Sequence, residues 1–338
     1  MKRKLLIAVA FLATMTAAAQ NIAAVSPSNT TTIYQTLEEA IVGAESGSSI
    51  YLPGGGFQIK DETKINKKLT IMGVSHRGDT DNVDGATVIS GNLHFEGGSS
   101  GSAVLGVYLS GNINVGTETD SVTNFTVRYC NVNSIQVKHS QSSGMVVNQS
   151  YLRNNCNFGS CNVRLENNIA HSISYINGGT VNHNIITSLS YFYNTRLRRT
   201  DPSQYVGINA STITNNIFLS YYEMVDMTPI NCQISNNLYL PSSNRVTHDM
   251  VPVMVENGKT WDDVFGEGNN KGVNILSDYT LKGTWGKGDA TDGSDIGIYG
   301  NIAEKKDLAP IPRIISKKVP DCTDESGKLR IIVKVKAQ

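Results

Sequence analysis

The sequence predicts an all-β fold in which short strands wind into a solenoid, a parallel β-helix. Three observations lead to this prediction. A motif of two polar residues followed by two apolar residues returns along the middle of the chain, polar and apolar residues alternate around it, and an amphipathic helical stretch precedes the first copies. A motif that returns at a nearly fixed interval is the sequence signature of a repeat protein.

The repeat is clearest in the segments GTVNHNIITS, STITNNIFLS and CQISNNLYLP, which begin at residues 179, 211 and 232. The second polar residue of the motif serves as a reference, and its copies are Asn131, Ser150, Asn168, Asn184, Asn216 and Asn237. Successive references are 19, 18, 16, 32 and 21 residues apart, so one interval is about double. Residues 191–209 in that interval are polar and Arg-rich, and we expect an extended coil or a projecting loop there.

The residues around each reference predict strands. The positions three before and one after it are apolar with one exception, Arg128, and the position two before it is mostly polar. This alternation with period 2 indicates short strands with inward apolar rows, which bury one another when coils stack ~4.8 Å apart. We expect the reference Asn to turn one strand into the next in the left-handed backbone region, with its amide hydrogen-bonding along the stack.

The N-terminal part of the chain predicts a cap and earlier coils. Residues 36–44 form an amphipathic stretch with a Thr-x-x-Glu capping pattern, Thr36 and Glu39, and a first strand is expected at residues 49–52. The segments LTIMGV, VISGNL and VLGVYLSGN, from residues 69, 88 and 104, carry Gly at a comparable turn position. A helix at the start covers the open end of a solenoid core.

These N-terminal residues resemble a known family. Leu37, Glu38, Ala40 and Ile41, then Gly47, IYLPGGGFQI and INKKLTIMGV are similar to the N-terminal signature of the right-handed β-helix superfamily that includes the pectate lyases. The resemblance covers about residues 33–245 and rests on turns and strands, without a catalytic motif. It implies a right-handed coil and an extracellular carbohydrate context, and it implies no activity.

The two ends of the chain define the expected domain organisation. Residues 1–20 combine a basic start, a short apolar stretch and small residues, as in a cleaved export signal. We therefore expect a β-helix over residues 21–257 in a secreted, periplasmic or cell-surface protein. Residues 258–338 are expected to form a closing segment and terminal strands, because apolar and basic residues alternate in GKLRIIVKVKAQ.

The composition excludes several classes of protein. Lys plus Arg and Asp plus Glu are 29 each, so no global charge attracts nucleic acid, and no apolar run is long enough to span a bilayer. The five cysteines lack zinc-site spacing; Cys156 and Cys161 are close enough for a local bridge, and Cys130 and Cys232 read as small core residues. Asp289, Asp292 and Asp295 are interpreted as turn residues rather than calcium ligands. No metal or cofactor is expected, and the oligomeric state is left open.

Basic and tyrosine side chains that follow the turns are the candidates for a site. A base beside a cation that neutralises a uronate is the chemistry of a polysaccharide lyase. The candidates for that chemistry are Lys138, His139, Arg198 and Arg199. Tyrosine faces stack on sugar rings and Arg holds carboxylate or sulfate. The candidates for substrate binding are Tyr175, Tyr191, Tyr193, Arg196, Tyr221 and Tyr222.

The sequence favours binding over catalysis. Between residues 121 and 250 the carboxylates are sparse, with no Asp ladder for Ca²⁺ and no recognisable pair for glycoside hydrolysis. The leading prediction is therefore an exported protein that binds an extracellular polysaccharide or other glycan, or acts at the cell surface, without catalysis. A calcium-independent polysaccharide lyase that acts on uronate glycans is the first alternative, and a structural or adhesive surface protein is the second.

Overall fold

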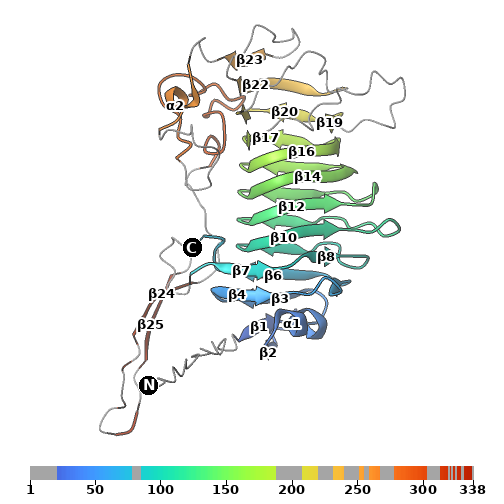
Figure 1. Ribbon diagram of the computed structural model, residues 1–338, viewed down its shortest axis with the longest axis vertical. Helices are drawn as coiled ribbons and strands as arrows, with labels where there is room; N and C mark the ends of the chain where they lie inside the picture. Colours follow the sequence, from blue (N-terminus) through green and yellow to red (C-terminus); the bar gives the residue numbers. More distant parts are fainter. Residues whose placement is uncertain are drawn as a thin grey trace, which may run out of the picture.

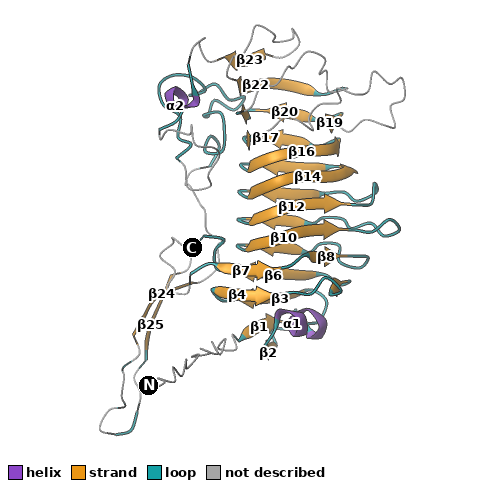
Figure 2. Cartoon of the chain, viewed as in Figure 1, coloured by secondary structure: helices purple, strands orange, loops and turns teal. Residues whose placement is uncertain are grey.

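The computed structural model describes residues 21–77, 85–187, 208–219, 231–239, 251–254, 259–266, 278–302, 313–318, 320, 323, 326–328 and 331–336. Within these residues, 23 strands join in one continuous, mostly parallel sheet, and two further strands form a separate antiparallel ribbon. The sheet winds upward coil by coil, as Figure 1 shows, and helices are few and short (Figure 2). The predicted parallel β-helix is confirmed. No described helix has the length and apolar character needed to cross a membrane.

The N-terminal cap consists of strands β1 (Ile22–Val25) and β2 (Thr31–Tyr34) and helix α1 (Leu37–Gly43). Thr36 caps the helix as predicted: its side chain accepts a hydrogen bond from the Glu39 N–H, and Glu39 Oε2 accepts one from the Thr36 N–H. The helix buries Leu37, Ala40 and Ile41 against the core. The first coil is therefore closed by a helix, as the sequence predicts.

Three ladders of parallel strands make the walls of the coils. The first ladder contains β3 (Ser48–Leu52), β6 (Leu69–Gly73), β9 (Ala103–Leu105), β11 (Thr126–Arg128), β13 (Met145–Asn148), β15 (Val163–Glu166), β17 (Thr180–Asn182), β20 (Thr212–Thr214) and the start of β22 (Gln233–Tyr239). The second contains β4 (Gly55–Gln58), β7 (Thr87–Ser90), the starts of β10 (Tyr108–Val115), β12 (Asn131–Val137), β14 (Tyr151–Cys161) and β16 (Ile169–Asn177), then β18 (Ile185–Ile186), β21 (Ile217–Phe218) and the end of β22.

The third ladder contains β5 (Lys64–Ile65), β8 (Leu93–Phe95), the second halves of β10, β12, β14 and β16, and β19 (Ile208–Asn209). The other described elements are β23 (Val251–Met254), which pairs with β22, helix α2 (Trp261–Val264), and the ribbon of β24 (Arg313–Lys318) and β25 (Ile332–Lys336).

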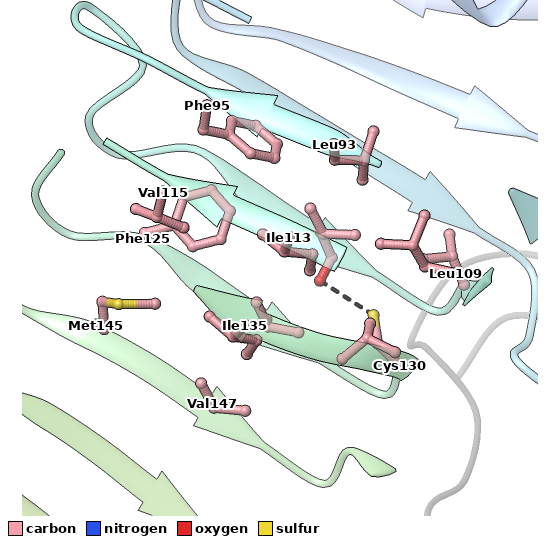
Figure 3. Packing of buried hydrophobic residues seen from close by; sticks show 14 of the residues in the cluster. Leu93, Phe95, Leu109, Ile113, Val115, Phe125, Cys130, Ile135, Met145 and Val147 are labelled. Carbon is pink, nitrogen blue, oxygen red and sulfur yellow. Dashed lines mark hydrogen bonds between the residues drawn. The ribbon is translucent and has the colours of Figure 1, made fainter. Parts of the chain in front are cut away.

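The core is built from rows of side chains that repeat from coil to coil. Figure 3 shows Leu93, Ile113 and Ile135, which occupy one register position on successive strands and are all fully buried. Phe95 and Phe125 meet edge to face beside them, with ring centroids 4.6 Å apart. Each coil therefore supplies part of the core of the next, as in other solenoids.

The corner between the first and second ladders corrects the predicted register by one residue. Arg128 pairs with Asn148 and Asn131 pairs with Tyr151, so Cys130, and not Asn131, stands beside Ser150. The error arose because Asn131 has the residue type that the motif favours. With Cys130 as reference, Val127 fills the apolar position that Arg128 appeared to interrupt.

The left-handed backbone also lies one residue earlier than predicted. The residues that precede the references have positive φ: Tyr129, Gln149, Asn167, His183, Asn215 and Asn236. The reference residues themselves form the expected ladder, in which Asn216 Oδ1 accepts from the Asn184 N–H at 2.9 Å and Asn237 Oδ1 accepts from the Asn216 N–H at 2.9 Å. Because Asn184 contacts Asn216 directly, the double interval is a single coil with an insertion.

The described cysteines are thiols. Cys130, Cys156 and Cys161 are buried and free, so the local bridge between Cys156 and Cys161 is a wrong prediction. Cys156 and Cys161 lie on β14 and belong to the hydrophobic core, where they pair in register with Ile173 and Ile176 of β16. Burial raises the pKa of each of these three thiols to about 12, which keeps them protonated and unreactive near neutral pH.

Residues 278–302, called the closing segment below, lie along the side of the coils instead of across their end. The apolar row one after the reference, Ile169, Ile185, Ile217 and Leu238, points away from the core and is covered by Leu281, Ile296 and Ile298 together with Phe265. The prediction that this row faces inward is therefore wrong. The row two after the reference, which includes Ala170, Ile186 and Phe218, faces the core in its place.

The closing segment is held by the side chains of the residues with positive φ. Asn167 Nδ2 donates to the Ile298 carbonyl, Asn215 Nδ2 donates to Thr291 Oγ1, and Asn236 Nδ2 donates to the Asp289 carbonyl. His183 Nδ1 lies 3.1 Å from the Gly297 carbonyl. The carboxylates of Asp289, Asp292 and Asp295 accept backbone N–H groups within the segment, which agrees with their interpretation as turn residues.

Candidate functional site

A groove of about 430 Å³ opens on the outer side of the third ladder. Two of the residues singled out in the sequence, Lys138 and Tyr175, lie in its wall. The complete lining is Asn114, Glu118, Gln136, Val137, Lys138, Asn157, Gly159, Ser160 and Tyr175. The volume falls within the range of roughly 300–1,000 Å³ that is usual for small-ligand sites.

Strand alternation places an amide in the floor of the groove on each of three coils. Asn114 pairs in register with Gln136, and Gln136 pairs with Asn157. Each of them stands between two buried neighbours on its strand, as Gln136 does between Ile135 and Val137. Because alternate side chains of a strand point to opposite faces, the three amides face outward in one row, called the amide row below.

Hydrogen bonds fix the amide row and leave part of each amide for a ligand. Gln136 Nε2 donates to Ser134 Oγ at 3.0 Å and to the Asn155 carbonyl at 2.9 Å, and Asn157 Oδ1 accepts from the Gly159 N–H at 2.8 Å. Asn114 Nδ2 lies 3.4 Å from His94 Nδ1. Among the described residues, Gln136 Oε1, Asn157 Nδ2 and Asn114 Oδ1 have no such partner, so the row offers both acceptors and a donor.

Charged side chains of opposite sign border the groove. Lys138 is exposed and follows directly after β12, where its backbone N–H donates to the Val115 carbonyl at 3.0 Å. Glu118 is exposed in the turn that follows β10. A ligand in the groove therefore meets one cation and one carboxylate at its edge.

Tyr175 has a strained backbone at the rim of the groove. Its φ is +56°, and the facing strand β14 carries three residues, Phe158 to Ser160, where β16 carries Tyr175 alone. A bulky residue in the left-handed region is unusual, and such strain is concentrated at functional sites. The bulge directs the half-buried Tyr175 side chain to the groove and not into the core row.

A charged cluster continues the amide row toward the N-terminal coils. His94 pairs in register with Asn114 on one side and Lys64 on the other. Lys64 Nζ lies 3.3 Å from Glu96 Oε1, and His94 Nε2 lies 3.8 Å from Asp61 Oδ1. Burial, followed by the Lys64 charge, lowers the pKa of His94, so its imidazole is neutral at pH 7. The third ladder thus presents polar groups to solvent over five successive coils.

Of the other predicted site residues, His139 alone is described, and it does not join this groove. His139 follows Lys138, but its Nδ1 accepts the Gln141 N–H at 3.1 Å and its side chain is not part of the lining. Tyr191, Tyr193, Arg196, Arg198, Arg199, Tyr221 and Tyr222 lie outside the described residues. The described lining holds one cation and one carboxylate, which is fewer than the two carboxylates of a glycoside hydrolase.

Sequence reasoning missed the amide row and Glu118. The signal for the row was present, because Asn114, Gln136 and Asn157 are spaced 22 and 21 residues apart and each lies between apolar residues. The row contains no charged or aromatic residue, and a reference at Asn131 instead of Cys130 shifts the predicted register upstream of Ser150 by one residue. Glu118 carries no such signal, since it lies in a turn that only the fold brings to the groove.

The described lining of the groove contains one carboxylate, that of Glu118, and no His or Cys. No group of three His, Cys, Asp or Glu residues in the described part of the chain is arranged to hold a metal ion. Comparison of the chain with protein-family models and with curated proteins gives no match. The fold and the groove are thus the basis for a functional proposal.

Proposed function

We propose that the protein binds an extended glycan along the outer face of the third ladder, without catalysis. The amide row in the floor of the groove carries this proposal. Three coils at ~4.8 Å each give the row a length of about 10 Å, which suits a chain molecule lying across the coils. The polar face that continues through His94 and Lys64 extends the same path.

The chemistry of the groove suits sugar hydroxyl groups. A hydroxyl both donates and accepts, and the row offers the oxygens of Asn114 and Gln136 beside the nitrogen of Asn157. Tyr175 adds an amphipathic ring at the rim, and Lys138 adds a cation for a carboxylate or sulfate group. The export signal predicted for residues 1–20, which lie outside the described part, is the second element of the proposal, because it brings the protein to extracellular polysaccharides.

A calcium-independent polysaccharide lyase is the second candidate, because Lys138, the candidate base, lines the same groove as Tyr175. In this candidate Lys138 takes the proton next to a uronate carboxylate, and the carboxylate requires a neutralising cation. Arg198 or Arg199 of the insertion would supply that cation. The groove itself offers Lys138 as its one described cation, and this is the reason that binding is proposed first.

The test measures binding and product formation together. Wild-type protein and the variants Gln136→Ala and Lys138→Ala are incubated with neutral and uronate polysaccharides, followed by affinity electrophoresis and by absorbance of the unsaturated product. We expect wild-type retardation without product, and about tenfold weaker binding for Gln136→Ala, since one lost hydrogen bond to a ligand costs about 1.4 kcal/mol.

The matched control is Asn154→Ala. Asn154 is an exposed amide that donates to Asn133 Oδ1 on a neighbouring corner and is not part of the groove lining, so its loss leaves binding unchanged. Product that disappears in Lys138→Ala supports the lyase instead. If the panel shows neither binding nor product, both candidates are contradicted and a structural or adhesive surface role is favoured.

A further inference from the structure

Large apolar side chains are exposed at two places in the described part of the molecule. Ile33, Val42 and Tyr51 are 51%, 71% and 37% exposed in and beside the N-terminal cap. Ile331, Ile332, Val333 and Val335 are 53%, 51%, 46% and 56% exposed in and beside β25. Exposed apolar side chains that gather in this way mark interaction surfaces, whereas single ones need no explanation.

The apolar side chains of the cap lie beside an open sheet edge. Among the described strands, β2 pairs only with β1, so the other edge of β2 keeps unpaired backbone groups. Ile33 and Tyr51 both stand opposite Ala23 of β1, which places the three residues side by side on one face. An edge strand with an exposed Ile is a template for the addition of another strand.

The ribbon of β24 and β25 is a second open edge. β25 pairs only with β24 among the described strands, and Figure 1 shows the ribbon drawn apart from the coils. In β25, Ile332 is followed by Val333 and Val335, which alternate with Lys334 and Lys336. A two-stranded ribbon with half-exposed Ile and Val is marginally stable in water and gains stability from a third strand.

The two surfaces have opposite charge. Residues 311–338 contain seven Lys and Arg against three Asp and Glu, and neither strand of the ribbon contains a carboxylate. Residues 21–59, which include the cap, contain Glu38, Glu39 and Glu45 and no Lys, Arg or Asp. Lys67 from the next coil reaches the end of α1, where its Nζ donates to the Val42 and Ala44 carbonyls. The cap segment, residues 21–59, therefore has a net negative charge, opposite to that of the ribbon.

We propose that the ribbon of one molecule adds β25 to the open edge of β2 in a second molecule, so that the protein associates head to tail. The pairing covers Ile33 at the open edge and the exposed side chains of β25, and it joins unlike charges. A symmetric pairing of two β25 strands is disfavoured because each strand carries Lys334 and Lys336, and the like charges repel each other. Since the two surfaces differ, each association leaves one cap and one ribbon free for a further molecule.

Sedimentation velocity of residues 21–338 at rising protein concentration tests the proposal. From about 1 µM to about 100 µM, we expect the mean mass to rise with concentration and to fall with added salt. Ile33→Lys and Val333→Lys each disable one surface, and each is expected to weaken association at least tenfold. Because both side chains are about half exposed, we expect unchanged circular dichroism.

A mixture of the two variants provides the decisive result. Ile33→Lys keeps its ribbon and Val333→Lys keeps its cap, so the mixture is expected to form a one-to-one dimer that grows no further. Val42→Thr, which changes an exposed side chain of α1 and not of the edge strand and adds no charge, is the matched control and is expected to associate like wild type. If Ile33→Lys alone associates as strongly as wild type, the ribbons pair with each other. If the wild-type protein is a monomer at every concentration, the cap and the ribbon do not bind each other. Either result overturns the proposal.

Discussion

Asn215 and Asn216 are neighbours with different functions in the coil. Asn215 has a φ of +59°, and its amide faces the closing segment at Thr291. Asn216 is fully buried, and its Nδ2 donates to the Val181 and Thr214 carbonyls while its Oδ1 accepts from Asn184. One residue thus provides the backbone turn, and the other satisfies the backbone groups that the turn exposes.

Replacement of Asn216 by Ala should destabilise the protein strongly. The substitution leaves the Asn184 N–H buried without its partner and removes the amide hydrogen bonds to the Val181 and Thr214 carbonyls, and we expect the free energy of unfolding to fall by about 3 kcal/mol. Urea denaturation followed by circular dichroism measures the change. Asn154→Ala, at an exposed amide in a neighbouring corner, should cost under about 1 kcal/mol. Equal losses in the two variants would contradict a special role for the buried ladder.

His183 stands at a position that is occupied by Asn on the two adjacent coils. Asn167 and Asn215 occupy the same register position, and all three have positive φ. The buried ring of His183 lies between the Gly297 carbonyl and the Asn215 amide, with Asp292 Oδ2 3.7 Å from its Nε2. Burial lowers the pKa of His183 more than the Gly297 carbonyl, Asp292 and Glu166 raise it.

This lowered pKa predicts a loss of stability in mild acid. An unfolded His titrates near 6.5, so below that pH the unfolded chain binds a proton that the folded imidazole takes up only at lower pH. The contribution of His183 is therefore complete above about pH 6.5 and is lost as the pH falls toward the folded pKa. His183→Asn should flatten the decline of the unfolding free energy between about pH 7 and pH 5. Identical slopes for wild type and variant would show that His183 does not contribute.

The residue scale also shows where sequence reasoning reached its limit. The repeat located the corner correctly, but Asn is suited both to positive φ and to an amide ladder, so the sequence could not assign the two functions to Asn215 and Asn216. Cys130 occupies the first copy of the ladder without an amide, and only the pairing of Arg128 with Asn148 places it there.

At the scale of elements, the closing segment depends on close contact with the coils. Gly297 has a φ of +95°, and a Cβ there would lie 2.5 Å from Ile217 Cδ1. Its N–H donates to the Asn215 carbonyl and its carbonyl faces His183. The segment can approach this near only because residue 297 has no side chain.

Gly297→Ala should therefore loosen the closing segment. The backbone strain of a side chain at positive φ adds to the overlap with Ile217, and we expect a total cost of about 2–4 kcal/mol. Limited proteolysis should cut residues 278–302 faster than in wild type. Gly293→Ala is the matched control, because Gly293 has a φ of +79° but a Cβ there meets open space. Equal proteolysis of the two variants would mean that the contact with Ile217 does not hold the segment.

The elements differed in how well the sequence predicted them. Helix α1 was predicted with its cap, because the signals of Thr36 and Glu39 are local. The place of the closing segment was not, because an apolar row such as Ile185 and Ile217 looks the same whether it faces the core or a covering segment. Burial by distant residues leaves no mark on the local period.

At the scale of the whole molecule, the repeat determined the fold and only part of the groove. Lys138 and Tyr175 were recognised because they follow turns of the coil, and the groove contains both. Glu118 and the bulge at Tyr175 were not predictable, since they depend on how many residues each coil inserts between aligned strands. Stacking converts such local irregularities into a surface, and that step requires the register of every coil.

The closing segment changes how the coils can separate. Coils that contact only their neighbours can come apart from one end, one at a time, in the manner of a zipper. Hydrogen bonds from Asn167, His183, Asn215 and Asn236 attach one segment to four coils in succession. Pulling along the solenoid axis therefore loads these attachments in shear, so that several must break together before the upper coils yield.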